Sequence, residues 1–377
     1  MTTRRYLITF SIVLALGAVL AIYAASRLTD VRHYPSAFSN LSGDQLFVVN
    51  GLTRKQMGEI KIGHIENNES PRVALMGNHQ FMMFGSEAFG PETPADYFFN
   101  FWYANLTLPE LRDLLIYMEK LDKLPGDVIL IQMTTPNNDN GHHIVNYNGE
   151  LPSDVIERAA TVAPVDRLYR LILDTDFRIR RTFDYSGFLF GLFASNMDNR
   201  VFDPAECQNS ATGLGGLRRK IIERLPLSIR LNMSSLLDKT AFCDRRLWAN
   251  SLRFDGSVST AYAPVAQPKL NAGSKDPTQA GLSVGDSERI AGFMQEIDDL
   301  GRRKGKAVIF VIPPVYESEH ESALNGIVDN ALARTKGLTV IDHRRLTLPA
   351  QYFHTFDHPT VPYFRLLVDE LRRTGKL

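Results

Sequence analysis

The chain has 377 residues, of which 44% are hydrophobic and 22% are charged, a composition typical of globular proteins. Lysine and arginine together number 42, as do aspartate and glutamate, so the formal net charge is +0. Proteins that bind nucleic acids show an excess or a stripe of positive charge, and we therefore expect no nucleic-acid partner. The length allows one large α/β domain with an insertion, or two domains.

The N-terminal segment predicts a membrane anchor. Arg4 and Arg5 precede twenty residues without charge, Tyr6 to Ala25, which is long enough for a helix to cross the hydrocarbon core of a bilayer. A cleaved signal peptide is the alternative, although its apolar region is normally shorter and Ala24-Ala25-Ser26 matches a cleavage site only loosely. The two arginines favour a cytoplasmic N-terminus. We expect residues 1–30 to hold a single span of the inner membrane, with the bulk of the chain in the periplasm.

A connector and the start of an α/β domain are predicted next. Residues 31–70 are largely polar and predict a connector, and the α/β domain is expected over residues 71–377, beginning with an apolar strand at Val73. Apolar residues at helical spacing from Leu108 to Leu121 predict a helix. The almost wholly apolar run from Asp127 to Gln132 is typical of a buried parallel strand.

Residues 145–285 predict a helical insertion followed by a loop. Amphipathic helical patterns recur within it at Val155 to Val162, Arg167 to Leu173 and Leu217 to Leu225, and residues 255–285 are rich in Ser, Ala, Pro and Gly. Both cysteines, Cys207 and Cys243, lie in this insertion. In an oxidising compartment they can form one disulfide, and two separate buried thiols remain the alternative.

The α/β pattern returns in the last part of the chain. A helix is expected over Glu288 to Arg303, followed by the strongest strand, Ala307 to Ile312, which Pro313-Pro314 terminates. A helix near 322–334, a strand near 338–341 and a closing amphipathic helix near 363–374 follow. Apolar strands that alternate with helices predict a three-layer α/β fold around a mostly parallel sheet.

The turn after the first strand is the first candidate site. Gly77, Asn78 and His79 follow the apolar run directly, and open α/β folds place their ligands at the carboxyl ends of such strands. His79 stands where a turn of this kind presents a reactive side chain. Asn105 precedes the helix at 108–121, where its amide could donate a hydrogen bond to a developing oxyanion.

A second candidate segment precedes the closing helix. It contains His354, Thr355, Asp357 and His358. A histidine on a loop at the sheet's edge can serve as the general base for a nucleophile on another loop. We therefore expect this segment to lie beside the turn at residues 77–79.

The order of these features resembles the SGNH/GDSL hydrolase superfamily. The matching features are Gly77-Asn78 after the first strand, an Asn before a helix, a strong strand that ends in Pro-Pro, and His358-Pro359 before the closing helix. The resemblance covers about residues 70–145 and 285–377. With the anchor and the insertion, the chain resembles periplasmic SGNH-like proteins that work with membrane-bound O-acyltransferases in alginate acetylation or in D-alanylation of teichoic acids. The resemblance implies a flavodoxin-like sheet, polysaccharide O-acylation, a membrane-bound O-acyltransferase as partner, and no cofactor.

Two positions depart from the family pattern and leave three interpretations open. His79 stands where the family has Ser, and Thr355 stands at the family's Asp position if His358 is its His. The first interpretation is catalysis by His79 with His358 and Asp357, with oxyanion or binding groups at Gly77, Asn78, Asn105, Thr355 and His354. The second is an inactive protein that binds glycan or acts as a scaffold. The third is a metal-dependent hydrolase with His79, His358 and Asp357 as ligands.

Three further features have a structural and a functional interpretation. His79 can simply form hydrogen bonds within the sheet edge. Gly285-Asp286-Ser287 spells the GDS tripeptide of the family, but it follows a loop and opens a helix, so an N-cap is the better explanation. Trp102 and Tyr103 can stack on a sugar ring, although core packing is the more common role of such aromatic residues.

Overall fold

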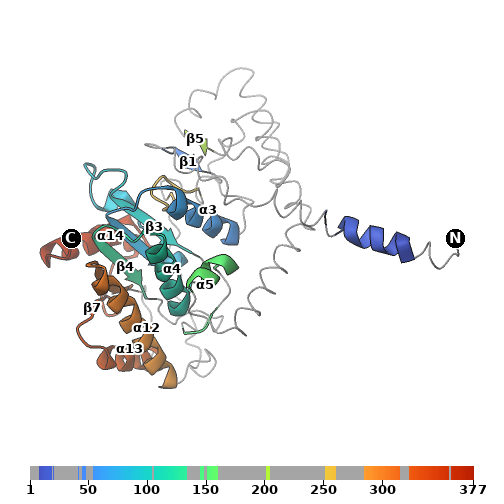
Figure 1. Cartoon of the computed structure of the whole chain (residues 1–377). Coiled ribbons are helices and arrows are strands. Elements are labelled where there is room, and N and C mark those ends of the chain that lie inside the picture. Colours follow the sequence, from blue (N-terminus) through green and yellow to red (C-terminus); the bar gives the residue numbers. More distant parts are fainter. Residues whose placement is uncertain are drawn as a thin grey trace, which may run out of the picture.

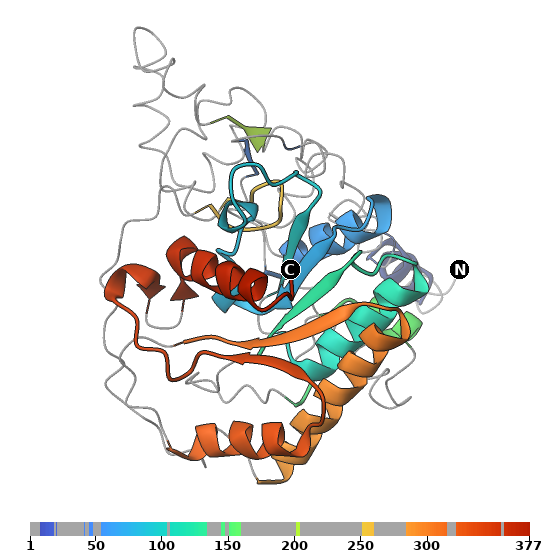
Figure 2. The same ribbon diagram turned by 90° about the vertical axis from the view of Figure 1, so that its left-hand side faces the viewer.

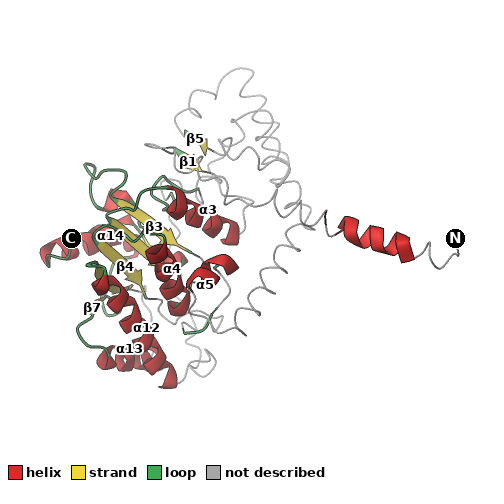
Figure 3. Cartoon of the chain, in the orientation of Figure 1, coloured by secondary structure: helices red, strands yellow, loops and turns green. Residues whose placement is uncertain are grey.

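Five strands form one parallel sheet that helices cover on both faces, as Figures 1 and 3 show. The computed structural model describes residues 8–18, 20, 41, 45–47, 54–103, 106–133, 145–147, 151–159, 201–203, 251–259, 284–314, 322–355 and 358–377. The strands are β1 (Leu46–Phe47), β2 (Val73–Gly77), β3 (Phe98–Trp102), β4 (Val128–Gln132), β5 (Val201–Phe202), β6 (Ala307–Ile312), β7 (Thr339–Asp342), β8 (Phe353–Thr355) and β9 (His358–Pro359). The helices are α3 (Arg54–Asn67), α4 (Leu108–Lys120), α5 (Ser153–Ala159), α12 (Val284–Arg303), α13 (Ser322–Arg334) and α14 (Val361–Arg373), with short 3₁₀ turns η2 (His79–Phe81), η3 (Ser86–Ala88) and η7 (Ala350–Tyr352).

The order of the strands places the switch point of the sheet at the ends of β2 and β4. The central sheet has the order β3-β2-β4-β6-β7, and every neighbouring pair is parallel. Renumbered along the chain, this is the order 2-1-3-4-5 of one group of doubly wound α/β folds. In such folds the winding reverses between the first and third strands, and ligands bind outside their carboxyl ends. Here that point lies at Gly77 and Gln132, where β2 and β4 end.

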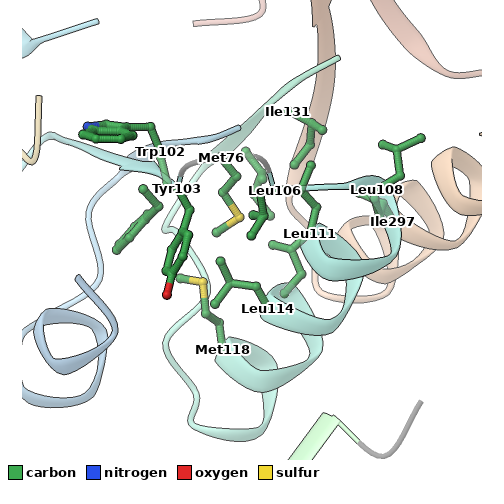
Figure 4. Close-up of a cluster of buried hydrophobic side chains, with 14 of the residues drawn as sticks. Met76, Trp102, Tyr103, Leu106, Leu108, Leu111, Leu114, Met118, Ile131 and Ile297 are labelled. Carbon is green, nitrogen blue, oxygen red and sulfur yellow. The ribbon is translucent and has the colours of Figure 1, made fainter. Parts of the chain in front are cut away.

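One face of the sheet packs against α3, α4, α12 and α13. The strands are short apolar runs whose residues are buried in β2, β3 and β4. Met76 and Ile131 from the sheet meet Leu111, Leu114 and Met118 of α4, with Trp102 and Tyr103 beside them (Figure 4). This cluster is the larger of the two hydrophobic cores among the described residues.

The opposite face is covered by α14 and by the segment that holds η2 and η3 (Figure 2). Between β2 and β3 the chain forms these two 3₁₀ turns, and aromatic side chains fill the space above the sheet. The ring of Phe84 stacks on that of Phe364 in α14 with centroids 4.6 Å apart, and Phe81 meets Phe364 edge to face at 5.1 Å. The segment that carries His79 is therefore fixed to the closing helix.

The α/β class and the mostly parallel sheet predicted from the sequence are confirmed, and some elements differ in detail. Helix α3 lies inside the segment predicted as a connector, and its Ile60, Ile62 and Ile65 belong to the larger core. Strand β3 was not predicted. Helix α12 begins at Val284, so Asp286 and Ser287 lie inside its first turn rather than at an N-cap position.

The structure describes only parts of the predicted anchor and insertion. Residues 8–18 and 20 are helical, and their large apolar side chains are 51% to 66% exposed. Among the described residues, none of the helices combines the length and the apolar character that a bilayer crossing requires. Most of the predicted insertion lies outside the described residues, together with Cys207 and Cys243.

Candidate functional site

The turn after β2 is built from Asn78 and ends with His79 at the carboxyl edge of the sheet. Asn78 is extended, and its side-chain Oδ1 accepts a hydrogen bond from the main-chain N–H of Gln80 over 2.9 Å. An Asn that caps the following turn in this way satisfies a main-chain donor that has no partner within the turn itself. Asn78 is 3% exposed, and His79 is the first residue of the η2 turn that it caps.

Gln132, the last residue of β4, fixes this turn from the neighbouring strand. Its Oε1 accepts from the main-chain N–H of Asn78 over 3.0 Å, and its Nε2 donates to Asn78 Oδ1 and to Gln80 Oε1, both over 2.7 Å. A Cβ atom on Gly77 would lie 2.4 Å from Gln132 Oε1. Glycine is therefore required at position 77 because the glutamine side chain packs directly on its Cα.

This network involves two residues, Gly77 and Asn78, that the sequence predicted as oxyanion or binding groups, and that role stays a prediction. The main-chain N–H of Asn78 and its Oδ1 both bond within the turn and to Gln132. The carbonyl oxygen of Gly77 accepts from the N–H of Tyr103 over 2.8 Å. In this structure the two residues shape the turn that presents His79.

The predicted meeting of the two loops is present in the structure. The imidazole rings of His79 and His358 lie with centroids 5.0 Å apart and planes inclined by 44°. His358 comes from β9, which pairs with β8 in an antiparallel hairpin just before α14. Both side chains are half-buried, and Nδ1 of His79 is buried. Two imidazoles from opposite ends of the α/β domain thus meet just beyond the carboxyl end of β2.

A third histidine, His354, lies on the same hairpin. Burial lowers the pKa of His354, and the nearby His358 lowers it further. A lowered pKa favours the neutral imidazole, which can accept a proton at one nitrogen and donate at the other. The site therefore holds a third imidazole, whose neutral form is favoured by burial and by the neighbouring His358.

The other predicted site residues are placed only in part. Asp357 and Asn105 lie outside the described residues. Thr355 pairs with His358 across the hairpin, and its side chain is not described. Within the described ranges, no group of three or more His, Cys, Asp or Glu side chains has an arrangement that could hold a metal ion. That result does not include Asp357, which the metal interpretation needs.

The alternative explanations of Trp102, Tyr103 and Ser287 are decided by burial. Trp102 and Tyr103 are 5% and 3% exposed, and the indole Nε1–H of Trp102 donates to the carbonyl oxygen of Gly256 over 3.0 Å. The core-packing interpretation is therefore confirmed. Ser287 is fully buried, and its hydroxyl donates to the carbonyl oxygen of Ile327 in α13 over 3.1 Å, so it is a structural residue of α12.

Comparison with known proteins found no matching family model, no matching curated protein and no matching solved structure. The resemblance to the SGNH/GDSL superfamily therefore rests on the residues quoted above and on their order in the chain.

Gln132 is the site residue that the sequence analysis missed. The signal was a polar residue at the carboxyl end of an otherwise apolar strand, Val-Ile-Leu-Ile-Gln. A buried amide needs hydrogen-bond partners. Because polar residues at this edge of a parallel sheet face the crevice or the neighbouring turn, this glutamine was a candidate partner for the turn after β2.

Proposed function

We propose that the protein takes part in O-acylation of a cell-envelope or secreted polysaccharide, and that His79 and His358 form its acyl-transfer pair. The observation that carries the proposal is the 5.0 Å separation of the two imidazole rings at the carboxyl edge of the sheet. Nucleophilic catalysis needs a nucleophile with a proton acceptor close by, and two neighbouring imidazoles can supply both functions. The resemblance to the SGNH/GDSL superfamily supplies the reaction class.

The chemistry proceeds in two steps. A ring nitrogen of neutral His79 attacks the carbonyl carbon of an activated acyl donor, the bond to the leaving group breaks, and the leaving group departs with the other imidazole proton. The acyl-imidazole then reacts with a hydroxyl group of the glycan, whose oxygen bonds to the acyl carbon as the bond to His79 breaks. His358 takes the hydroxyl proton and returns it to His79, which restores both neutral imidazoles.

The N-terminal segment and the family resemblance suggest where the acyl group comes from and where in the cell the protein lies. We infer a membrane-bound O-acyltransferase as the source of the acyl group, an inner-membrane anchor within residues 6–25, and a periplasmic SGNH-like domain with a helical insertion at residues 145–285. Support comes from the uncharged run after Arg4 and Arg5 and from the helix at residues 8–18 and 20, whose large apolar side chains are exposed.

Replacement of His79 tests the catalytic proposal. In cells that lack the wild-type copy, His79→Ala should abolish acylation of the polysaccharide, measured as ester-linked acyl groups per sugar. His64→Phe is the matched control, because His64 lies on α3, stacked on Phe99. Normal acyl content with His79→Ala would refute the acyl-transfer pair. Mass spectrometry of the purified full chain after reaction with an activated acetyl ester should show the acyl group on His79.

A non-catalytic role is the second candidate, and the contacts of Asn78 favour it. The main-chain N–H of Asn78 donates to Gln132 rather than pointing to an open pocket, so an oxyanion would need donors from elsewhere. In this case the protein binds glycan or holds the membrane-bound acyltransferase. Deletion of the gene would then abolish acylation while His79→Ala preserved it, and the acyltransferase would co-purify with the wild-type chain and the variant alike.

A further inference from the structure

A further histidine, His343, is buried and takes no part in the pair. It is the first residue after β7, and its main-chain N–H donates to the carbonyl oxygen of Ile312 at the end of β6 over 3.0 Å. His343 is 8% exposed. Its position at the sheet edge is therefore fixed by the backbone, and its imidazole points at α14.

Both ring nitrogens of His343 are engaged by side chains of α14. Nε2 lies 2.8 Å from Oε2 of Glu370, and Nδ1 lies 3.1 Å from the hydroxyl oxygen of Tyr363. An ionised Glu370 carboxylate can only accept, so Nε2 of His343 is the donor in that contact. In the neutral tautomer that carries its proton on Nε2, Nδ1 accepts from the Tyr363 hydroxyl.

The Tyr363 ring supports the turn that carries His79. Tyr363 is fully buried, and its ring centroid lies 6.1 Å from that of Phe81, the last residue of η2. Burial, together with the nearby Glu370, raises the pKa of Tyr363 well above its usual value. The phenol consequently keeps its proton and remains a donor to His343.

The backbone around Tyr363 also holds the hairpin that carries His358. The N–H of Tyr363 donates to the carbonyl oxygen of Thr360 over 2.9 Å. Thr360 in turn donates its own N–H to Tyr352 over 2.9 Å and its hydroxyl to Gln351 over 3.0 Å, both to carbonyl oxygens just before β8. Tyr363 thus contacts one segment of the site through its ring and the other through its backbone.

We propose that Tyr363, held by His343, is a positioning residue that sets the separation of the His79 and His358 imidazoles. Its ring supports η2, its backbone closes the β8–β9 hairpin, and the bond from its hydroxyl to His343 fixes how deeply the ring sits against Phe81. The inference deepens the proposed function and rests on it for the chemical role of the pair. The geometry itself is measurable without any acyl chemistry.

Nuclear magnetic resonance of the full chain, with histidine selectively labelled, tests the inference. The readouts are the nuclear Overhauser effect between the ring protons of His79 and His358 and the pH midpoints of the two imidazoles. Tyr363→Phe keeps the ring and removes the hydroxyl. The matched control is Tyr117→Phe, because Tyr117 is equally buried and its hydroxyl donates to Glu66 within the other core.

We expect Tyr363→Phe to weaken or abolish the signal between the two rings and to change both midpoints, while Tyr117→Phe leaves them as in the wild type. His343→Gln should behave like the wild type, since an amide can accept from Tyr363 and donate to Glu370. His343→Leu should behave like Tyr363→Phe. Unchanged signals in Tyr363→Phe, or equal changes in Tyr117→Phe, would overturn the inference.

The outcome is separable from that of the proposed function. If His79→Ala leaves acylation intact but Tyr363→Phe still separates the rings, the acyl-transfer role fails and the positioning role stands. If His79→Ala abolishes acylation and Tyr363→Phe leaves the ring signals and acylation intact, the positioning role fails alone.

Discussion

Gln132 and Asn78 exchange two hydrogen bonds across the point where β2 and β4 end. The main-chain N–H of Asn78 donates to Oε1 of Gln132 over 3.0 Å, and Nε2 of Gln132 donates to Oδ1 of Asn78 over 2.7 Å. The glutamine side chain thereby continues the pairing of the two strands beyond their last residues. The orientation of His79, the next residue in the chain, depends on this pair.

Replacement of Gln132 by leucine should destabilise the turn. Leucine has a similar volume but lacks both polar atoms of the glutamine side chain. The N–H of Asn78 then loses its acceptor, Gln132 Oε1, and the side-chain oxygens of Asn78 and Gln80 lose their donor, Gln132 Nε2. Buried polar groups that lose a partner cost about 1–3 kcal/mol. Chemical denaturation measures the loss in free energy of unfolding. The control Gln295→Leu, at an exposed hydrogen bond on α12, should change stability by only about 0.5 kcal/mol.

Gly77→Ala and Gly292→Ala should change stability in opposite directions. A Cβ on Gly77 would lie 2.4 Å and 2.5 Å from Oε1 and Cβ of Gln132, so the glutamine must move out of its network. Overpacking of this kind costs about 1–3 kcal/mol. Gly292 is exposed on α12 with nothing within 4 Å, and alanine there should stabilise the helix by about 1 kcal/mol. Thermal melting should show a lower melting temperature for Gly77→Ala and a higher one for Gly292→Ala than for the wild type. Equal shifts in the two variants would contradict the close packing of Gln132 on Gly77.

Of the five strands in the central sheet, the sequence predicted β2, β4, β6 and β7 and missed β3, which has a polar residue inside an aromatic run. Asn100 interrupts the aromatic run of β3, yet it is fully buried because its Nδ2 donates to the carbonyl oxygens of Phe81 and Phe84. Helix α3 was hidden in the same way by Lys61, whose ammonium group donates to the carbonyl oxygens of Asn100, Trp102 and Gly256. Partners so distant in the chain cannot be read from a local pattern.

The two loops of the site were predictable and the residues that position them were not. His79 directly follows a parallel strand, and the segment at 354–358 directly precedes the closing helix, so the fold class was enough to predict that the two would meet at the sheet's edge. The pairing of Gln132 with Asn78 depends on β2 and β4 being neighbours, which the order along the chain does not specify. His343 and Tyr363 depend in addition on the way α14 packs on the sheet.

The stability of the protein should fall between neutral pH and about pH 4 because of His64. This ring is stacked on Phe99 at 4.1 Å, and burial together with the charge of Lys61 lowers the pKa of His64 from 6.5 to about 4. Between these values the unfolded chain binds more protons than the folded chain, so unfolding becomes easier as the pH falls. The contribution should be about 2 kcal/mol less at pH 5 than at pH 7.

His64→Phe isolates this contribution. Phenylalanine retains the stack on Phe99 and removes the titrating group. Denaturation curves of the wild type and the variant at pH 5 and pH 7 give the difference, and the variant should lose less stability over this interval. An equal loss in both proteins would show that other groups govern the pH dependence.

Removal of the His358 imidazole should raise the pKa of His354. Burial of His354 is the larger cause of its lowered pKa, and the positive charge that His358 carries when protonated is the second. His358→Gln removes the second cause and keeps a polar side chain on β9, so protonation of His354 becomes easier while its burial is unchanged.

Titration followed by nuclear magnetic resonance should show the His354 midpoint moving to higher pH. The midpoint of His64, which lies on α3, should stay near 4 and serves as the internal reference. If the His354 midpoint stayed in place, or moved together with that of His64, the two hairpin histidines would not share a site, and His354 would no longer belong to the acyl-transfer centre.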